Sequence, residues 1–129
     1  MTANPYQKEI IATYILAPIL MAIETWRRWD NLWSMSYFDD VILVVLAGIA
    51  VYFLRKQQFI GQLLWLFAAG ACFMMINISF FWAIEEMNLP DASGLAMSKV
   101  IAVKALMYLI ILLMTWRAFR LLLTTKFST

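Results

Sequence analysis

Four long apolar runs alternate with short polar segments along the chain. The runs cover residues 10–23, 41–54, 59–84 and 100–116. A helix needs about 20 mostly apolar residues to span the hydrocarbon core of a bilayer. Lipid offers the backbone no hydrogen-bond partners, so each run is predicted to be a helix. A transmembrane β-barrel is excluded because the runs are continuously apolar instead of alternating.

The predicted fold is an all-α integral membrane protein, a bundle of four antiparallel transmembrane helices in a single domain over residues 1–129. The expected helices cover approximately residues 5–30, 37–56, 58–86 and 98–124. Only the short segment "RKQQ" separates the second helix from the third, and so short a link fits an antiparallel hairpin. Pro18 lies inside the first helix and removes a backbone hydrogen bond, so a kink is expected there.

Local features also predict how two helices begin and pack. Asn4 followed by Pro5 suits the start of the first helix, with the asparagine as its N-cap. The second and third helices carry small residues at comparable depth, in Ala47–Gly48 and Ala68–Cys72. Small residues let helix backbones approach closely in lipid, so these segments are expected to face each other. A leucine in place of Gly48 is then expected to overpack the contact.

Composition supports the membrane assignment and removes several classes of function. Hydrophobic residues make up 64% of the chain and charged residues 14%, whereas soluble domains carry about 25% charged residues. The net charge of +2, with no basic stripe, argues against nucleic acid as a partner. The absence of histidine excludes histidine-ligated haem, zinc sites and serine–histidine catalysis. We therefore assign no catalytic residue, expect no cofactor and favour a protein that is not an enzyme.

The distribution of basic residues predicts the orientation of the helices. The side with both termini and the turn between the second and third helices carries six of them: Lys8, Arg55, Lys56, Arg117, Arg120 and Lys126. The opposite side carries four: Arg27, Arg28, Lys99 and Lys104. The positive-inside rule then places the N- and C-termini in the cytoplasm. The expected location is a bacterial plasma (inner) membrane.

Acidic residues are distributed far more unevenly than basic ones. Seven of the eight carboxylates fall on the non-cytoplasmic side, and Glu9 is the exception. The fifteen residues from Asp40 to Arg55 cover about 22 Å of helix, and Ile10 to Ile23 cover about 20 Å before Glu24. These stretches are too short to carry both acids clear of a hydrocarbon core of about 30 Å. Glu24 and Asp40 are therefore expected to lie in a polar environment that the protein supplies.

The sequence predicts a polar binding cluster on the non-cytoplasmic side. Its candidate members are Glu24, Arg28, Asp40, Asn77, Glu85, Glu86 and Lys104. Lys104 is expected to pair with Glu24 or Asp40, although a lysine near a helix end can also extend to the interface. Simpler roles are an interhelical hydrogen bond for Asn77 and a solvated loop for Glu85–Glu86. Carboxylates alone would suit Mg²⁺, Ca²⁺ or Mn²⁺, but no known motif spacing is present, so the metal stays unassigned.

Two functions from different classes fit these features. The first is a non-catalytic subunit, scaffold or modulator of a larger membrane assembly, favoured by the lack of soluble mass and of catalytic residue types. The second is a small oligomeric transporter or channel, coupled to a cation or proton, that uses the acidic cluster. The bilayer is one expected partner, together with other membrane proteins or further copies of the chain.

Overall fold

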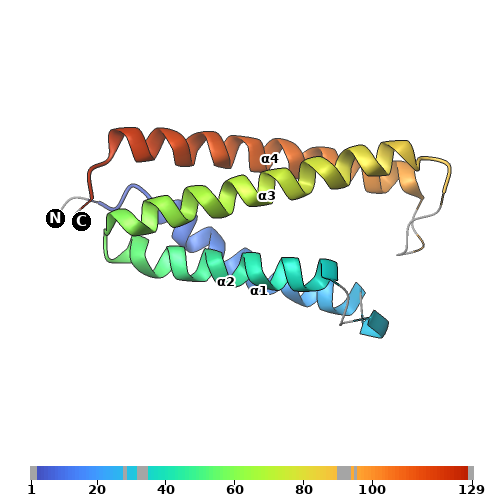
Figure 1. Ribbon diagram of the computed structural model, residues 1–129, viewed down its shortest axis with the longest axis horizontal. Helices are drawn as coiled ribbons and strands as arrows, with labels where there is room; N and C mark the ends of the chain where they lie inside the picture. Colours follow the sequence, from blue (N-terminus) through green and yellow to red (C-terminus); the bar gives the residue numbers. More distant parts are fainter. Residues whose placement is uncertain (1–2, 28, 32–34, 90–93, 95, 128–129) are drawn as a thin grey trace.

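The computed structural model describes residues 3–27, 29–31, 35–89, 94 and 96–127. Its elements are α1 (Gln7–Arg27), the short 3-10 helix η1 (Trp29–Asn31), α2 (Met35–Arg55), α3 (Phe59–Glu85) and α4 (Met97–Thr124). The described part of the chain is all-helical, and the four long helices dominate it (Figure 1). Each of them contains one of the four apolar runs, as the sequence predicts.

All four α-helices are long and apolar enough to cross a membrane. The candidate spans are Gln7–Trp26, Tyr37–Arg55, Phe59–Glu85 and Met97–Thr124. Their mean hydropathy is 1.4 for the first span and 2.0 for each of the others. The predicted class is therefore confirmed at this level: the chain is a small, all-helical integral membrane protein.

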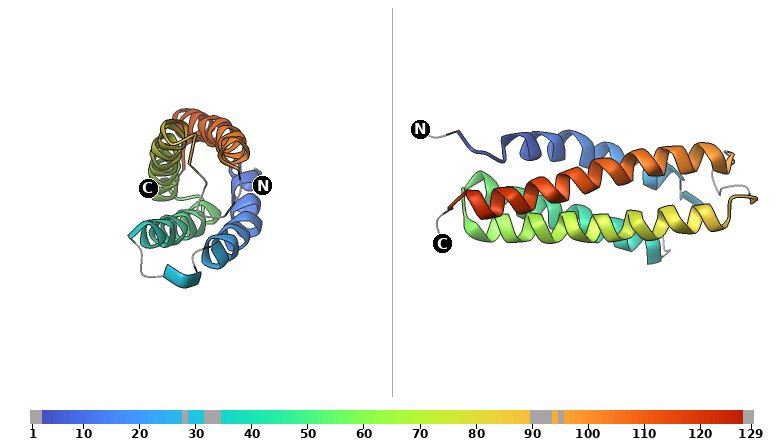
Figure 2. Two further views of the ribbon diagram at one scale, coloured as in Figure 1. Left: turned by 90° about the vertical axis from the view of Figure 1, so that its right-hand side faces the viewer. Right: turned by 90° about the horizontal axis from the view of Figure 1, so that it is seen from above.

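The helices lie side by side in chain order. α1 packs against α2, α2 against α3, and α3 against α4, and no comparably close pairing joins α1 to α3 or α4 within the described residues. Both termini and the turn between α2 and α3 lie at one end, which we call the terminus end (Figure 1). At the opposite end, the far end, α1 and α2 separate from α3 and α4 (Figures 1 and 2). The arrangement is closed at one end and open at the other.

The two halves of the molecule also differ in length. α1 and α2 have 21 residues each, whereas α3 has 27 and α4 has 28. At 1.5 Å per residue these are helices of about 32 Å and about 41 Å. Because α2 and α3 are joined at the terminus end, α3 and α4 extend beyond α2 at the far end (Figure 1).

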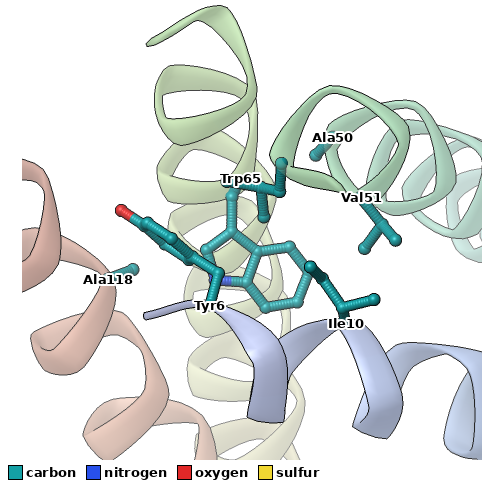
Figure 3. Packing of buried hydrophobic residues seen from close by; sticks show 7 residues of the cluster. Tyr6, Ile10, Ala50, Val51, Trp65 and Ala118 are labelled. Carbon is teal, nitrogen blue, oxygen red and sulfur yellow. The ribbon is translucent and has the colours of Figure 1, made fainter. Parts of the chain in front are cut away.

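The main hydrophobic core lies at the terminus end and receives side chains from all four helices. Its buried members are Tyr6, Ile10, Ala50, Val51, Leu54, Trp65 and Ala118. Figure 3 shows the Trp65 indole between Tyr6 and Ile10, with Ala50 and Val51 of α2 on the Ile10 side. Because Tyr6 precedes α1 and Ala118 lies near the end of α4, this core fixes the two ends of the chain against the α2–α3 hairpin.

The N-terminal segment is attached to the same hairpin by Asn4. The Asn4 Oδ1 atom accepts a hydrogen bond from the Tyr6 backbone amide at 3.0 Å, as expected of a residue that caps a helix start. Its Nδ2 atom donates to the Leu54 carbonyl oxygen at 2.9 Å, in the last turn of α2. One side chain thus orders the start of α1 and connects it to α2.

The turn between α2 and α3 follows a Schellman motif. Gln57 has a φ of 53°, and the backbone amides of Gln57 and Gln58 donate to the carbonyl oxygens of Leu54 and Phe53 at 3.0 and 3.1 Å. These two bonds satisfy carbonyl groups that the end of a helix leaves free. Glutamine occupies the left-handed position where glycine is the usual residue.

The close approach of α2 and α3 lies nearer this turn than the sequence predicts. A Cβ atom at Gly61 would lie 2.6 Å from the Leu54 amide nitrogen and 2.7 Å from the Phe53 carbonyl carbon. At Gly48 a Cβ atom would meet nothing within 4 Å, and Gly48 is exposed. The predicted pairing of α2 with α3 is correct, but the predicted contact at Gly48 is wrong. Gly48 faces away from α3, whereas Ala50 and Val51 of α2 are buried.

Candidate functional site

The members of the predicted polar cluster come from all four helices. Glu24, Asp40, Asn77, Glu86 and Lys104 are half-buried in the described structure. Glu85 is exposed at the end of α3, and Arg28 lies outside the described residues. Protein therefore covers part of each of these five side chains. That they form one cluster remains a prediction.

Two hydrogen bonds connect α4 to α3 in this region. The Lys104 ammonium donates to the Ser79 carbonyl oxygen at 3.4 Å, so this side chain reaches the neighbouring helix. The Tyr108 hydroxyl donates to Asn77 Oδ1 at 2.6 Å. Asn77 thus makes the interhelical hydrogen bond expected of a polar side chain in a membrane helix.

Asp40 and Lys104 lie on the two helices that pack against α3. α2 carries Asp40 and α4 carries Lys104, and both helices contact α3. An ionisable group within a membrane span is costly in lipid and is tolerated where protein surrounds it. The Lys104 ammonium reaches the Ser79 carbonyl oxygen toward the far end of α3.

The carboxylates of this region do not form a metal site in the part of the chain that the structure describes. No group of three or more histidine, cysteine, aspartate or glutamate residues there is placed to hold an ion. The far end instead presents large aromatic side chains. Trp26 is 80% exposed and Trp82 is 57% exposed.

A second polar cluster lies at the terminus end, inside the main core. We define it as Tyr6, Glu9, Gln62, Trp65 and Arg117 and call it the terminus cluster. Gln62 is only 1% exposed, and its Nε2 atom donates to the Tyr6 hydroxyl at 3.1 Å and to the Thr125 carbonyl oxygen at 3.2 Å. This one amide connects α3 to the N-terminal and C-terminal segments.

An ion pair within the terminus cluster joins α1 directly to α4. Arg117 Nε donates to Glu9 Oε1, and Arg117 Nη2 donates to the Pro5 carbonyl oxygen at 3.1 Å. Glu9 is 7% exposed, whereas the Arg117 side chain is 44% exposed. The carboxylate is therefore the buried partner, and its charge is compensated by a guanidinium that still contacts solvent.

Three atoms of the terminus cluster are buried without a hydrogen-bond partner in the described structure. They are Glu9 Oε2, Gln62 Oε1 and Trp65 Nε1. A buried polar atom without a partner costs about 1–3 kcal/mol. The cluster is thus sensitive to substitution, because any further loss of a partner adds to an existing penalty.

The Tyr6 hydroxyl stays neutral in this environment. Burial raises the pKa of Tyr6, the hydrogen bond from Gln62 lowers it, and the nearby Glu9 carboxylate raises it; the net shift is upward. A raised tyrosine pKa favours the protonated phenol in the folded state. Tyr6 therefore acts as a neutral hydrogen-bonding group beside the Glu9–Arg117 ion pair.

Sequence reasoning missed the terminus cluster. Glu9 was set apart as the single acid on a basic side of the molecule, and that isolation is the one signal that could have drawn attention to it. Gln62 follows the "RKQQ" turn by a few residues and resembles a continuation of the polar turn. Only the fold shows that Gln62 and Glu9 face the same interior.

The polar groups described above suit ion pairing and binding better than covalent catalysis. Glu9 is already paired with Arg117, and Asn77 is used in an interhelical hydrogen bond. No protein-family model, curated protein or solved structure matches the chain. A function for this chain is therefore proposed from its own structure.

Proposed function

We propose that this membrane protein is a non-catalytic subunit, scaffold or modulator of a larger membrane assembly. The observation that carries this proposal is the divergence of the helices at the far end, where α1 and α2 separate from α3 and α4 (Figures 1 and 2). Half-buried charged residues lie toward that end on three different helices: Glu24, Asp40 and Lys104. Charged groups in membrane helices face protein or water because contact with lipid is costly. A partner protein that covers this end would shield the exposed parts of these half-buried charged side chains from lipid.

Exposed aromatic residues at the far end support the same proposal. Trp26 on α1 and Trp82 on α3 are largely uncovered, and Met87 beyond α3 is 55% exposed. Tryptophan and methionine are enriched in the centres of protein–protein interfaces. Interfacial tryptophans also contact lipid headgroups, so the experiment has to separate a protein neighbour from lipid.

Site-specific photo-crosslinking in native membranes tests the proposal. A photoreactive phenylalanine analogue at Trp82 should yield one discrete crosslinked protein of a different sequence. The matched control is the same analogue at Leu123, which is 68% exposed at the terminus end of α4 and should give no such product. Crosslinks to lipid alone at both positions would reject the subunit proposal. Crosslinks at Trp82 to further copies of the chain would favour the second candidate below.

In this proposal the helices are antiparallel transmembrane segments of a bacterial plasma (inner) membrane protein, with both termini cytoplasmic. The six-to-four distribution of basic residues supports that orientation. Pro18 within α1 supports a kink, because proline removes a helix hydrogen bond. Cysteine labelling from the two sides of the membrane tests the orientation: Thr2→Cys and Asn88→Cys should react from opposite sides.

The second candidate function is a small oligomeric transporter or channel, coupled to a cation or proton. The observation that favours it is Asp40, a half-buried acid within the candidate span Tyr37–Arg55 of α2. Acidic groups within membrane spans mark ion and proton pathways in membrane proteins. Four helices leave little room for a complete pathway, so this function requires several copies of the chain.

A double-mutant cycle tests whether these charges act together. Lys104→Met alone is expected to reduce the free energy of unfolding in detergent by about 1–2 kcal/mol, because it leaves a partly buried acid uncompensated. Combining it with Asp40→Asn or Glu24→Gln should restore much of the loss. Additive losses in both combinations would show independent charges and would remove the predicted polar cluster as a site.

A further inference from the structure

A groove at the terminus end lies between the first turns of α1 and the end of α2. Its volume is about 410 Å³, and its lining residues are Asn4, Gln7, Ile10, Ile11, Tyr14, Arg55 and Gln57. α1 contributes Ile10, Ile11 and Tyr14, and the remaining lining residues are three amides and the Arg55 guanidinium. The groove is therefore amphipathic, with an apolar wall that continues along α1 and a polar rim at the end of the span.

The Arg55 guanidinium is held in this groove by Tyr14. Arg55 Nη1 donates to the Tyr14 hydroxyl at 3.0 Å, and the guanidinium carbon lies 5.8 Å from the centre of the Tyr14 ring. The next residue, Lys56, is held in a similar way, with its ammonium 4.3 Å from the centre of the Tyr52 ring. Both cations thus lie beside tyrosine rings of the apolar helices while their side chains stay exposed.

This geometry leaves Arg55 able to bind an anion at the membrane interface. One hydrogen bond to Tyr14 uses one of the five N–H groups of the guanidinium, and the remaining groups suit bidentate binding of a phosphate. Arg55 is the last residue of its candidate span, at the depth where lipid phosphates lie. The adjacent Gln7 amide offers a further donor at the rim of the groove.

The charge around the groove favours an anionic lipid over a zwitterionic one. Among the residues that the structure describes, no acid lines the groove, and Glu9, the acid that the sequence places on this side, is buried and paired with Arg117. Lys8 and Lys56 flank it in the sequence. A choline or ethanolamine group would place a second positive charge beside these cations, whereas a glycerol headgroup would not. Basic pockets on the cytoplasmic side of membrane proteins bind anionic headgroups for the same reason.

We infer that the groove binds the headgroup of an anionic phospholipid, with the phosphate on Arg55 and an acyl chain along Ile11 and Tyr14. This inference goes beyond the proposed function and does not depend on it, since a subunit or a transporter can each carry such a lipid. Lipid titration of the delipidated full chain, followed by native mass spectrometry, measures it. Phosphatidylglycerol should bind at least about tenfold more tightly than phosphatidylcholine, the factor that corresponds to 1.4 kcal/mol.

Two substitutions of arginine by glutamine locate the site. Arg55→Gln should weaken phosphatidylglycerol binding about tenfold and phosphatidylcholine binding by a smaller factor, so the preference for phosphatidylglycerol should shrink. The matched control, Arg120→Gln, removes an exposed positive charge of the same end outside the groove and should leave both affinities unchanged. Equal losses in the two variants would show general surface attraction and overturn the inference, as would equal binding of the two lipids to the unaltered chain.

Two further measurements keep the result interpretable. Tyr14→Phe retains the charge and the ring but releases the Arg55 guanidinium, so it should weaken phosphatidylglycerol binding about threefold, less than Arg55→Gln does. Far-UV circular dichroism confirms that each variant stays helical, which is expected because Arg55 and Tyr14 are exposed. If inorganic phosphate protects the chain against thermal unfolding as well as phosphatidylglycerol does, the site is one for free phosphate and the lipid assignment is wrong.

Discussion

Replacing Arg117 with methionine is expected to lower the free energy of unfolding by about 3 kcal/mol. The substitution removes the partner of Glu9 and leaves a carboxylate that is 7% exposed in the core of the terminus end. Breaking a buried ion pair from one side typically costs about 3–5 kcal/mol, and the half-exposed position of Arg117 places the value at the lower limit. Reversible unfolding in mixed detergent, monitored by circular dichroism, measures the change.

Two companion variants identify the cause of that loss. Glu9→Gln combined with Arg117→Met should recover most of the stability, because no charge is then left buried. Arg120→Met, one turn further along α4, should change the stability by less than about 0.5 kcal/mol. The Arg120 guanidinium makes no hydrogen bond or ion pair with the residues that the structure describes. If Arg117→Met and Arg120→Met have equal effects, the ion pair does not hold α1 to α4.

Gly61→Ala is expected to destabilise the protein by about 1–3 kcal/mol. The added Cβ atom would lie 2.6 Å from the Leu54 amide nitrogen and 2.7 Å from the Phe53 carbonyl carbon. Both are backbone atoms, so the hairpin has to open instead of rotating a side chain away, and overpacking of this kind costs about 1–3 kcal/mol. The midpoint of thermal unfolding in detergent should fall accordingly.

Gly48→Ala is the matched control for Gly61→Ala. Its Cβ atom would meet nothing within 4 Å, and alanine is about 0.5–1 kcal/mol better than glycine inside a helix. The same chemical change should therefore raise the unfolding midpoint at residue 48 and lower it at residue 61. Changes of the same sign at both positions would contradict the close approach of α2 and α3 at Gly61.

The elements of this fold could be predicted from the sequence because each apolar run has the length of a membrane span. The contacts between helices were harder to predict. Gly48 and Gly61 are both glycines of adjoining helices, and only the rotation of each helix decides which one faces the partner. That rotation depends on the turn, where Gln57 adopts a left-handed conformation. Glutamine at this position does not predict such a conformation, as glycine would.

For the polar sites, too, the sequence indicated which residues are unusual but not which residues come together in the fold. Charge asymmetry along the sequence directed attention to the acids of the far end; the cluster predicted there stays a prediction, and Lys104 reaches the Ser79 carbonyl oxygen of α3. Glu9 stood out only as a single acid on a basic side, and Gln62 did not stand out at all. The two residues are more than fifty positions apart and are buried in one region only when the termini fold onto the α2–α3 hairpin. Their contacts with Arg117 and Thr125 are long-range, and no local pattern encodes them.

The unequal lengths of the helices have a consequence for the surrounding lipid. A span of about 32 Å matches a typical bilayer, whereas spans of about 41 Å exceed it by about 10 Å. Hydrophobic mismatch costs a fraction of a kcal/mol per ångström and is relieved by tilting, by local deformation of the bilayer or by association with other helices. The membrane is therefore expected to be thinner along α1 and α2 than along α3 and α4. Acyl chains stretched along α3 and α4 carry the cost of the mismatch, and their replacement by a neighbouring helix of matching length would lower the free energy of the assembly.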